Sequence, residues 1–224
     1  MSSLHEFRLR AAEYSEGFSS TPVYELVLAI CSGVDLGNDL LDFGPGRCFF
    51  VERLLTSGYG GALTCADLLP RPASLPERVR WIAADLNDPL PLPDQSFDTI
   101  ISTDVVAHLE NPRFVFREFS RLLRPNGSLV VTTSNQESIR AITGLIFGEH
   151  FAAFRGVAYP ALITALLRED FRRICAESGF IPPRFYYSDS GLVPKLHLSW
   201  QRLSLGLLKG RAFSDHLAVA TRKA

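Results

Sequence analysis

The sequence lacks several features that define whole classes of protein. Its 224 residues hold 23 Lys and Arg against 24 Asp and Glu, a formal net charge of -1. Such a balance gives no overall attraction to nucleic acid or anionic lipid. No apolar run is long enough to span a bilayer, and residues 1–10 lack the apolar core of a signal peptide. We therefore expect a cytoplasmic protein that binds no nucleic acid.

Cysteine is scarce and shows no metal-binding pattern. The four cysteines, Cys31, Cys48, Cys65 and Cys175, form no C-x-x-C pair and have no histidine at ligand spacing. This argues against both a structural zinc site and a disulfide framework. We expect reduced, mostly buried cysteines and no metal, in a chain whose length suits one domain.

A glycine turn at residues 40–50 is the most informative stretch. A short apolar run ends at Asp42, and Gly44 and Gly46 follow before a segment suited to a helix. Glycine lets a ligand approach the main chain closely. The G-x-G-x-x-G dinucleotide pattern would need a third glycine where Phe49 stands, and the Asp42 carboxylate would repel a pyrophosphate but attract an ammonium. A zwitterionic ligand is favoured, and a glycine turn without a ligand remains open.

Strands and helices are predicted to alternate after this turn, which indicates a parallel sheet covered on both faces. Two helices, 4–14 and 23–31, precede it. The predicted strands are 40–42, 61–66, 79–84, 97–102 and 128–133, with helices at 49–57, 114–123, 137–147 and 162–178, and two late strands at 184–187 and 216–221.

An acid ends the second predicted strand about 20 residues beyond the glycine turn. This acid, Asp67, is placed to accept both hydroxyls of a ribose, whichever nucleoside cofactor is bound. The alternative is a solvated turn acid that caps the proline-rich loop after it.

Three stretches together resemble the class I S-adenosylmethionine-dependent methyltransferases. Asp42-x-Gly44-x-Gly46 is similar to the first motif of that family, D/E-x-G-x-G-x-G, with Cys48 at the last position. Residues 98–112 resemble its fourth motif region. Arg124-Pro125-Asn126-Gly127, between a helix and an apolar strand, is also typical of the family. The resemblance covers residues 40–133.

This resemblance implies an α/β fold: a single-domain, Rossmann-like, seven-stranded, mostly parallel sheet with a C-terminal antiparallel hairpin and helices on both faces. It divides the single domain 1–224 into an N-terminal helical cap (1–36), a cofactor-binding core (37–133), a substrate-pocket insertion and helix (134–180) and the hairpin region (181–224, with an insertion at 191–213).

The resemblance also implies the cofactor, S-adenosylmethionine, and its product S-adenosylhomocysteine. Asp85 would accept from the adenine amino group. Tyr14 would contact the cofactor from the N-terminal cap, or would simply pack there. The full set of implied cofactor-binding residues is Asp42, Gly44, Gly46, Asp67, Leu68, Asp85, Leu86, Ser102 and Tyr14.

Two histidines are candidates for a general base, because a neutral imidazole near pH 7 can take a proton from a hydroxyl. His108 follows the fourth strand and His150 lies in the aromatic insertion, and a packing role is open for each. The insertion, with Phe147, Phe151, Phe154 and Tyr159, suits a small molecule or a sugar. We expect O-methylation of a metabolite or saccharide. The alternatives are an NAD-dependent oxidoreductase and a non-catalytic nucleoside-binding or interaction protein.

A leucine-rich segment at 192–210 also carries Lys195, Arg202 and Lys209. It could lie on a membrane surface. We expect instead that its leucines and Trp200 are buried against the domain or a homodimer mate, because exposed leucines are a liability in a monomer. Gly206 and Pro194 argue against one long helix.

Overall fold

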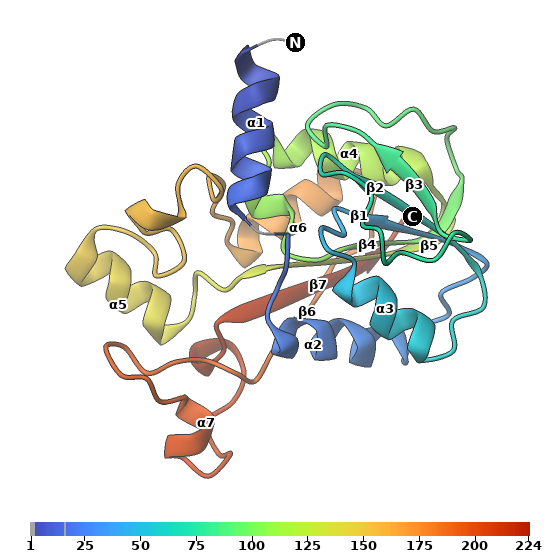
Figure 1. The fold of residues 1–224 in the computed structure, drawn as a ribbon. Coiled ribbons are helices and arrows are strands. Elements are labelled where there is room, and N and C mark those ends of the chain that lie inside the picture. The colour runs from blue at the N-terminus through green and yellow to red at the C-terminus, as the bar shows by residue number, and fades with distance from the viewer. Residues whose placement is uncertain (1–2, 16) are drawn as a thin grey trace.

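The computed structural model describes residues 3–15 and 17–224. Within them, seven strands form one sheet in the order β3-β2-β1-β4-β5-β7-β6 (Figure 1). The strands are β1 (Asp39–Phe43), β2 (Ala62–Asp67), β3 (Arg80–Ala83), β4 (Phe97–Ser102), β5 (Leu123–Ser134), β6 (Arg184–Tyr187) and β7 (His216–Arg222). The helices are α1 (Ser3–Tyr14), α2 (Thr21–Cys31), α3 (Phe49–Thr56), α4 (Pro112–Leu122), α5 (Ile139–Gly148), α6 (Arg168–Glu177) and α7 (Trp200–Leu203), with short 3-10 turns η1 (Val106–His108), η2 (Gly156–Ala158) and η3 (Arg211–Phe213).

Strand pairing confirms the predicted architecture. The pairs among β1, β2, β3, β4 and β5 are all parallel, whereas β7 is antiparallel to both β5 and β6. The last two strands are thus the expected hairpin, with β6 at the edge. The chain changes direction across the sheet between β1 and β4, where open α/β sheets bind their ligands.

Two apolar cores lie on opposite faces of this sheet. On one face α4 and α6 bring Phe116, Phe119 and Phe171 onto the strands. On the other face, which Figure 1 shows covered by α2 and α3, these two helices lie against the strands. They contribute Val27 and Phe50 to the second core. All four cysteines are free and buried, as predicted.

Helix α6 begins six residues later than the sequence predicts. The preceding segment is fixed in an extended path because the amides of Ile163 and Thr164 both donate to the Ala107 carbonyl, at 2.9 and 3.0 Å. The Thr164 hydroxyl also donates to the Leu109 carbonyl, at 2.6 Å. These distant partners outweigh the local helical spacing, and they draw the segment toward the end of β4.

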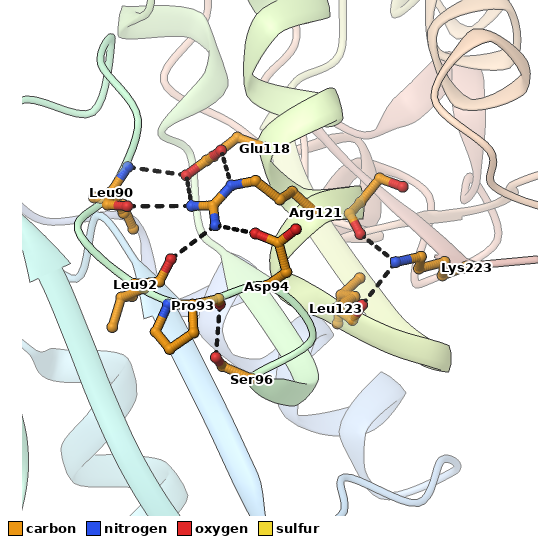
Figure 2. Close-up of polar contacts among 10 residues, drawn as sticks. Leu90, Leu92, Pro93, Asp94, Ser96, Glu118, Arg121, Leu123 and Lys223 are labelled. Carbon is orange, nitrogen blue, oxygen red and sulfur yellow. Dashed lines mark hydrogen bonds and ion pairs between the residues drawn. The ribbon is translucent and has the colours of Figure 1, made fainter.

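A partly buried ion pair fixes the loop between β3 and β4 to α4 (Figure 2). Glu118 accepts from the Leu90 amide at 2.9 Å and pairs with Arg121 at 2.6 Å. Arg121 in turn donates to the carbonyls of Leu90 and Leu92 and to Asp94. The loop that follows Asp85 is therefore held at several points.

The leucine-rich segment differs from expectation. Its only helix within the described residues is the four-residue α7, on a loop that projects from the sheet (Figure 1). Five leucines are exposed, so their expected burial against the domain is wrong, whereas burial against a dimer mate stays a prediction: Leu192, Leu196, Leu203, Leu205 and Leu207. No helix in the described part of the chain has the length and apolar character to cross a membrane.

Candidate active site

One cavity of about 140 Å³ lies at the carboxyl ends of β1, β2, β3 and β4. Three predicted acids, Asp42, Asp67 and Asp85, line it together with the glycine turn. A further part of the wall comes from the N-terminal segment, which contributes Phe7, Arg8, Ala11 and Ala12 from α1. The sheet thus brings together residues from four strand ends, as the sequence predicts.

The glycine turn is packed against the N-terminal segment. A Cβ on Gly46, whose φ is 53°, would lie 2.2 Å from the Gly17 carbonyl oxygen, and a Cβ on Gly44, at φ 80°, would lie 2.3 Å from a Val105 methyl. Cys48 also has a left-handed φ of 64°, the conformation that a glycine at this motif position would favour. Both glycines are therefore required by close contacts within the chain.

The main-chain amides of this turn are already bonded. Gly46 N donates to Asp67 Oδ2 at 2.8 Å, and Arg47 N donates to the Gly17 carbonyl at 2.7 Å. Gly44 N and Cys48 N donate to carbonyls of Ala66 and Pro45. The turn thus offers a close approach to the main chain rather than a row of free amides.

Asp42 has no hydrogen-bond partner for either carboxylate oxygen among the described residues. It is 1% exposed. Burial raises its pKa to about 8, and the neighbouring Asp67 carboxylate adds to the rise. A buried carboxylate without a donor is costly unless a ligand supplies one. A ligand ammonium fits this requirement.

Asp67 is bonded at both oxygens. Oδ2 accepts from Gly46 N and Oδ1 accepts from Leu69 N, each at 2.8 Å. Burial raises its pKa, and these amides oppose the rise. Each carboxylate oxygen has a second lone pair, so both can still accept a hydroxyl proton.

Asp85 is bound by α1, which the sequence did not predict. Arg8 Nη1 donates to Asp85 Oδ2 at 2.9 Å, and Arg8 also pairs with Glu110 at 2.7 Å. The other Asp85 oxygen accepts from the amide and the side chain of Asn87. Burial alone would raise the pKa of Asp85, but the hydrogen bonds from Asn87 and Arg8 outweigh it and lower the pKa. Nothing in the sequence around Arg8 indicates this long-range contact.

Asp104 is a second residue that sequence reasoning missed. It lines the cavity directly after β4 and has a positive φ of 57°. The hydroxyls of Ser19 and Thr132 donate to its carboxylate, and His216 Nδ1 lies 3.7 Å from it. Its place at the carboxyl end of a central parallel strand was the available signal.

The two predicted histidines are separated. His108 lines the cavity, and its Nδ1 lies 2.7 Å from the Ala161 carbonyl. A carbonyl only accepts, so Nδ1 carries a proton. Burial lowers the His108 pKa, which keeps the ring neutral. His150 is not among the residues that line the cavity; its Nδ1 lies 3.1 Å from the Phe151 carbonyl.

Of the other predicted site residues, some line the cavity and some do not. Leu68 and Leu86 line the cavity. Ser102 is buried beside it but does not line it, and the Tyr14 hydroxyl donates to the Val157 carbonyl, at 2.8 Å, outside the lining. The aromatic side chains of the insertion do not line it either; from that region only Pro160 and Ile163 do. Within the described residues, no group of three His, Cys, Asp or Glu could hold a metal ion.

Solved structures share this architecture over nearly the whole chain. A Thermotoga maritima methyltransferase, described as a possible histamine N-methyltransferase, superposes with a TM-score of 0.65 at 17% identity and covers 99% of this chain and 91% of its own. The Burkholderia thailandensis 1,6-didemethyltoxoflavin N1-methyltransferase was solved with 1,6-didemethyltoxoflavin and S-adenosylhomocysteine bound. It superposes with a TM-score of 0.63 at 16% identity, and the match covers 100% of this chain and 92% of that protein. The fold is that of the class I S-adenosylmethionine-dependent methyltransferases.

Sequence comparison places the family signal in the core. Residues 41–131 match the family model described as a methyltransferase domain, so the chain carries such a domain. Malonyl-acyl-carrier-protein O-methyltransferases from Hahella chejuensis and Paenibacillus sp. are 29% and 27% identical over 70% and 63% of this chain. The chain spans 58% and 54% of the length of these two relatives and 21% of a biotin-biosynthesis bifunctional protein from Teredinibacter turnerae.

Proposed function

We propose that this protein transfers a methyl group from S-adenosylmethionine to a hydroxyl of a small metabolite or saccharide. The observation that carries the proposal is the buried, unpartnered carboxylate of Asp42 beside the glycine turn. It fits the ammonium of an aminoacyl group. Asp67, at the end of the next strand, fits the ribose hydroxyls of the same cofactor.

The apolar lining fits the remaining part of this cofactor. Leu68 and Leu86 would contact the adenine ring, and Asp85 would accept from its amino group. Asp85 Oδ1 already accepts two hydrogen bonds from Asn87, whereas Oδ2 accepts only one, from Arg8, so the adenine amino group would share Oδ2 with Arg8. Residues of α1 line this cavity beside the three acids, so α1 would cover the bound cofactor.

The cofactor, when bound, supplies an electrophilic methyl group on a sulfonium. The chain has to bind and align the acceptor, exclude water and hold the departing proton. We assign the proton to His108, whose neutral ring lies in the cavity wall. Phe7 and Phe18 line the cavity and would exclude water from a bound ligand. His150, outside the lining, is the less favoured base.

An oxygen acceptor is supported by the names of the sequence relatives. They include malonyl-acyl-carrier-protein and ubiquinone-biosynthesis O-methyltransferases. The cavity wall near His108 is apolar, with Val105, Leu109 and Ile163, which suits an acceptor with an apolar part. The acidic lining formed by Asp42, Asp67 and Asp104 disfavours a polyanionic acceptor.

Calorimetric titration tests the cofactor. We expect S-adenosylmethionine and S-adenosylhomocysteine to bind and NAD not to bind. Asp42→Asn should weaken S-adenosylmethionine binding by about tenfold to a hundredfold, because a charge-assisted hydrogen bond is lost. The exposed Asp88 provides the matched control, Asp88→Asn, which should bind as the wild type does. Tight NAD binding without a response to the sulfonium would refute the proposal.

A screen with methyl-labelled cofactor tests the acceptor. Hydroxylated metabolites and saccharides should be labelled, whereas amines and RNA should not. Labelling of RNA or protein alone would overturn the acceptor class, and cofactor binding without transfer to any acceptor would favour a non-catalytic nucleoside-binding protein.

A further inference from the structure

The loop between β6 and β7 exposes leucines at its tip. We name residues 192–211 the leucine loop. Leu205 is 93% exposed and Leu207 is 85% exposed, and Leu196 and Leu203 are more than half exposed. Exposed apolar side chains that gather on one segment indicate an interaction surface rather than ordinary surface variation.

The backbone of this loop is held in place. Gln201 accepts from Gly191 N at 3.1 Å and donates to the carbonyls of Leu208 and Phe213, at 2.9 and 3.0 Å. The Trp200 and Phe213 rings meet edge to face, with centroids 5.4 Å apart. The Gln201 side-chain amide and the Trp200 and Phe213 rings therefore hold the loop together, and the exposed leucines take no part in this packing.

The charge of the leucine loop is of one sign. Lys195, Arg202, Lys209 and Arg211 are all exposed, and no acid stands between Asp189 and Asp215. None of these four cations forms an ion pair within the described part of the chain. In a chain with a net charge of -1, this is a strong local excess. Cations around a protruding apolar tip complement an anionic lipid surface, where charges meet head groups and leucines enter the apolar layer below.

We propose that the leucine loop docks the protein onto an anionic membrane surface. The charge pattern favours lipid over a second copy of the chain, because four like charges would face one another across a two-fold interface. An acidic protein could meet the cations, but it would have to provide a groove for two nearly fully exposed leucines.

The position of the loop makes this docking relevant to the cavity. Arg140 on α5 pairs with Asp215, at 2.7 Å, at the base of the loop. β7 begins at His216, whose Nδ1 lies 3.7 Å from Oδ2 of the cavity residue Asp104. Figure 1 places α5 and α7 on the same side of the molecule, and α5 also exposes Ile146 and Phe147. Docking would bring the ligand-binding edge of the sheet to the bilayer. The inference does not depend on methyl transfer.

Vesicle co-sedimentation of the full chain tests the proposal. Phosphatidylserine–phosphatidylcholine vesicles should bind the wild type at low salt, and phosphatidylcholine alone should bind it weakly. High salt should release the protein, because it screens exposed charges. A Leu205→Ser, Leu207→Ser double variant and a Lys195→Gln, Lys209→Gln double variant should each lose at least about tenfold in partitioning.

Val34→Ser is the matched control, because Val34 is an exposed apolar residue outside the leucine loop and outside the cavity lining. It should bind vesicles as the wild type does, and circular dichroism should show every variant folded. Equal vesicle binding by wild type and the leucine variant would overturn the proposal. So would a wild-type dimer that dissociates in the leucine variant without any vesicle binding, or capture of an acidic carrier protein alone.

Discussion

At the scale of single residues, three of the carboxylates that line the cavity differ in how many hydrogen-bond donors the protein provides for them. Asp85 has an arginine partner, Asp67 has two amides, and Asp42 has neither. Proximity of Asp42 to Asp67 makes the imbalance larger, because the second carboxylate adds to the cost of ionising the first. Stability is thus sacrificed where the ligand ammonium would bind.

Asp42→Asn should stabilise the ligand-free protein in a pH-dependent way. The Asp42 pKa rises from 3.8 to about 8 on folding, so the native state holds an extra proton between these values. The free energy of unfolding of the wild type therefore falls as pH rises from about 4 toward 8, because ionising the buried Asp42 becomes necessary in the native state. The gain from Asp42→Asn should be larger at pH 8 than at pH 5. Thermal melts across this range measure it, and a gain that shrinks with pH would contradict the assignment.

Asp67→Ala should affect both ligand and fold. The variant loses a charged acceptor for two ribose hydroxyls, so its affinity for S-adenosylhomocysteine should fall by more than about tenfold. The freed amides of Gly46 and Leu69 should also lower the free energy of unfolding by about 1 to 3 kcal/mol. Calorimetry and denaturant melts separate the two effects. An unchanged dissociation constant would leave Asp67 as a turn acid only.

At the scale of elements, α1 acts as a cover over the cavity, and Arg8 joins it to the ligand-binding edge of the sheet. Phe7, Ala11 and Ala12 line the cavity, and Arg8 joins α1 to the ends of β3 and η1 through Asp85 and Glu110. The loop under Asp85 is in turn anchored to α4 (Figure 2). The ion pairs of Arg8 therefore hold α1, whereas the Arg121–Glu118 pair holds the loop after Asp85.

Arg8→Ala should loosen the cover. Its partner Asp85 is largely buried, and a lost charge-assisted hydrogen bond at such a site should speed dissociation of S-adenosylhomocysteine by about tenfold. Arg10, exposed on the same helix, gives the control Arg10→Ala. Stopped-flow measurement of release distinguishes them, and identical release rates for both variants would show that Arg8 does not hold α1.

Arg121→Met should be far more destabilising than Arg113→Met. Removing Arg121 leaves Glu118, whose side chain is 5% exposed, as an uncompensated buried charge, which costs about 3 to 5 kcal/mol. Arg113 pairs with Glu177 on the surface, where a pair contributes about 0 to 1 kcal/mol. Urea unfolding of both variants measures the difference, and equal midpoints would contradict this account of the anchor.

At the scale of the whole molecule, the cavity and the leucine loop are separate structures on one edge of the sheet. The loop leaves and rejoins the body at adjacent points, since a Cβ on Gly191 would lie 2.4 Å from the Phe213 carbonyl. No leucine-loop residue lines the cavity. The two surfaces can therefore be changed independently.

Replacing residues 193–211 with a Gly-Gly linker should leave cofactor binding intact. The adjacent ends allow the linker, and we expect the dissociation constant for S-adenosylhomocysteine to change by less than about twofold. Vesicle binding should be lost in the same variant. A tenfold loss of cofactor affinity in a variant that remains folded would show that the loop supports the cavity.

The sequence by itself determined the strand-turn-helix at Asp42, the succession of strands and helices along the chain and the acid at the end of β2, because glycine conformations and apolar periodicity are local properties. The start of α6 could not be predicted, because its path follows from bonds to Ala107 and Leu109. Arg8 on Asp85, Asp104 beside His216 and the separation of His108 from His150 were decided only by tertiary structure. The outward position of Leu205 was also decided by the folded loop, since bonds from Gln201 to the Leu208 and Phe213 carbonyls hold that loop. The first three depend on contacts between segments far apart in the chain, and the loop depends on bonds across its own 7 to 12 residues, so apolar periodicity indicates none of them.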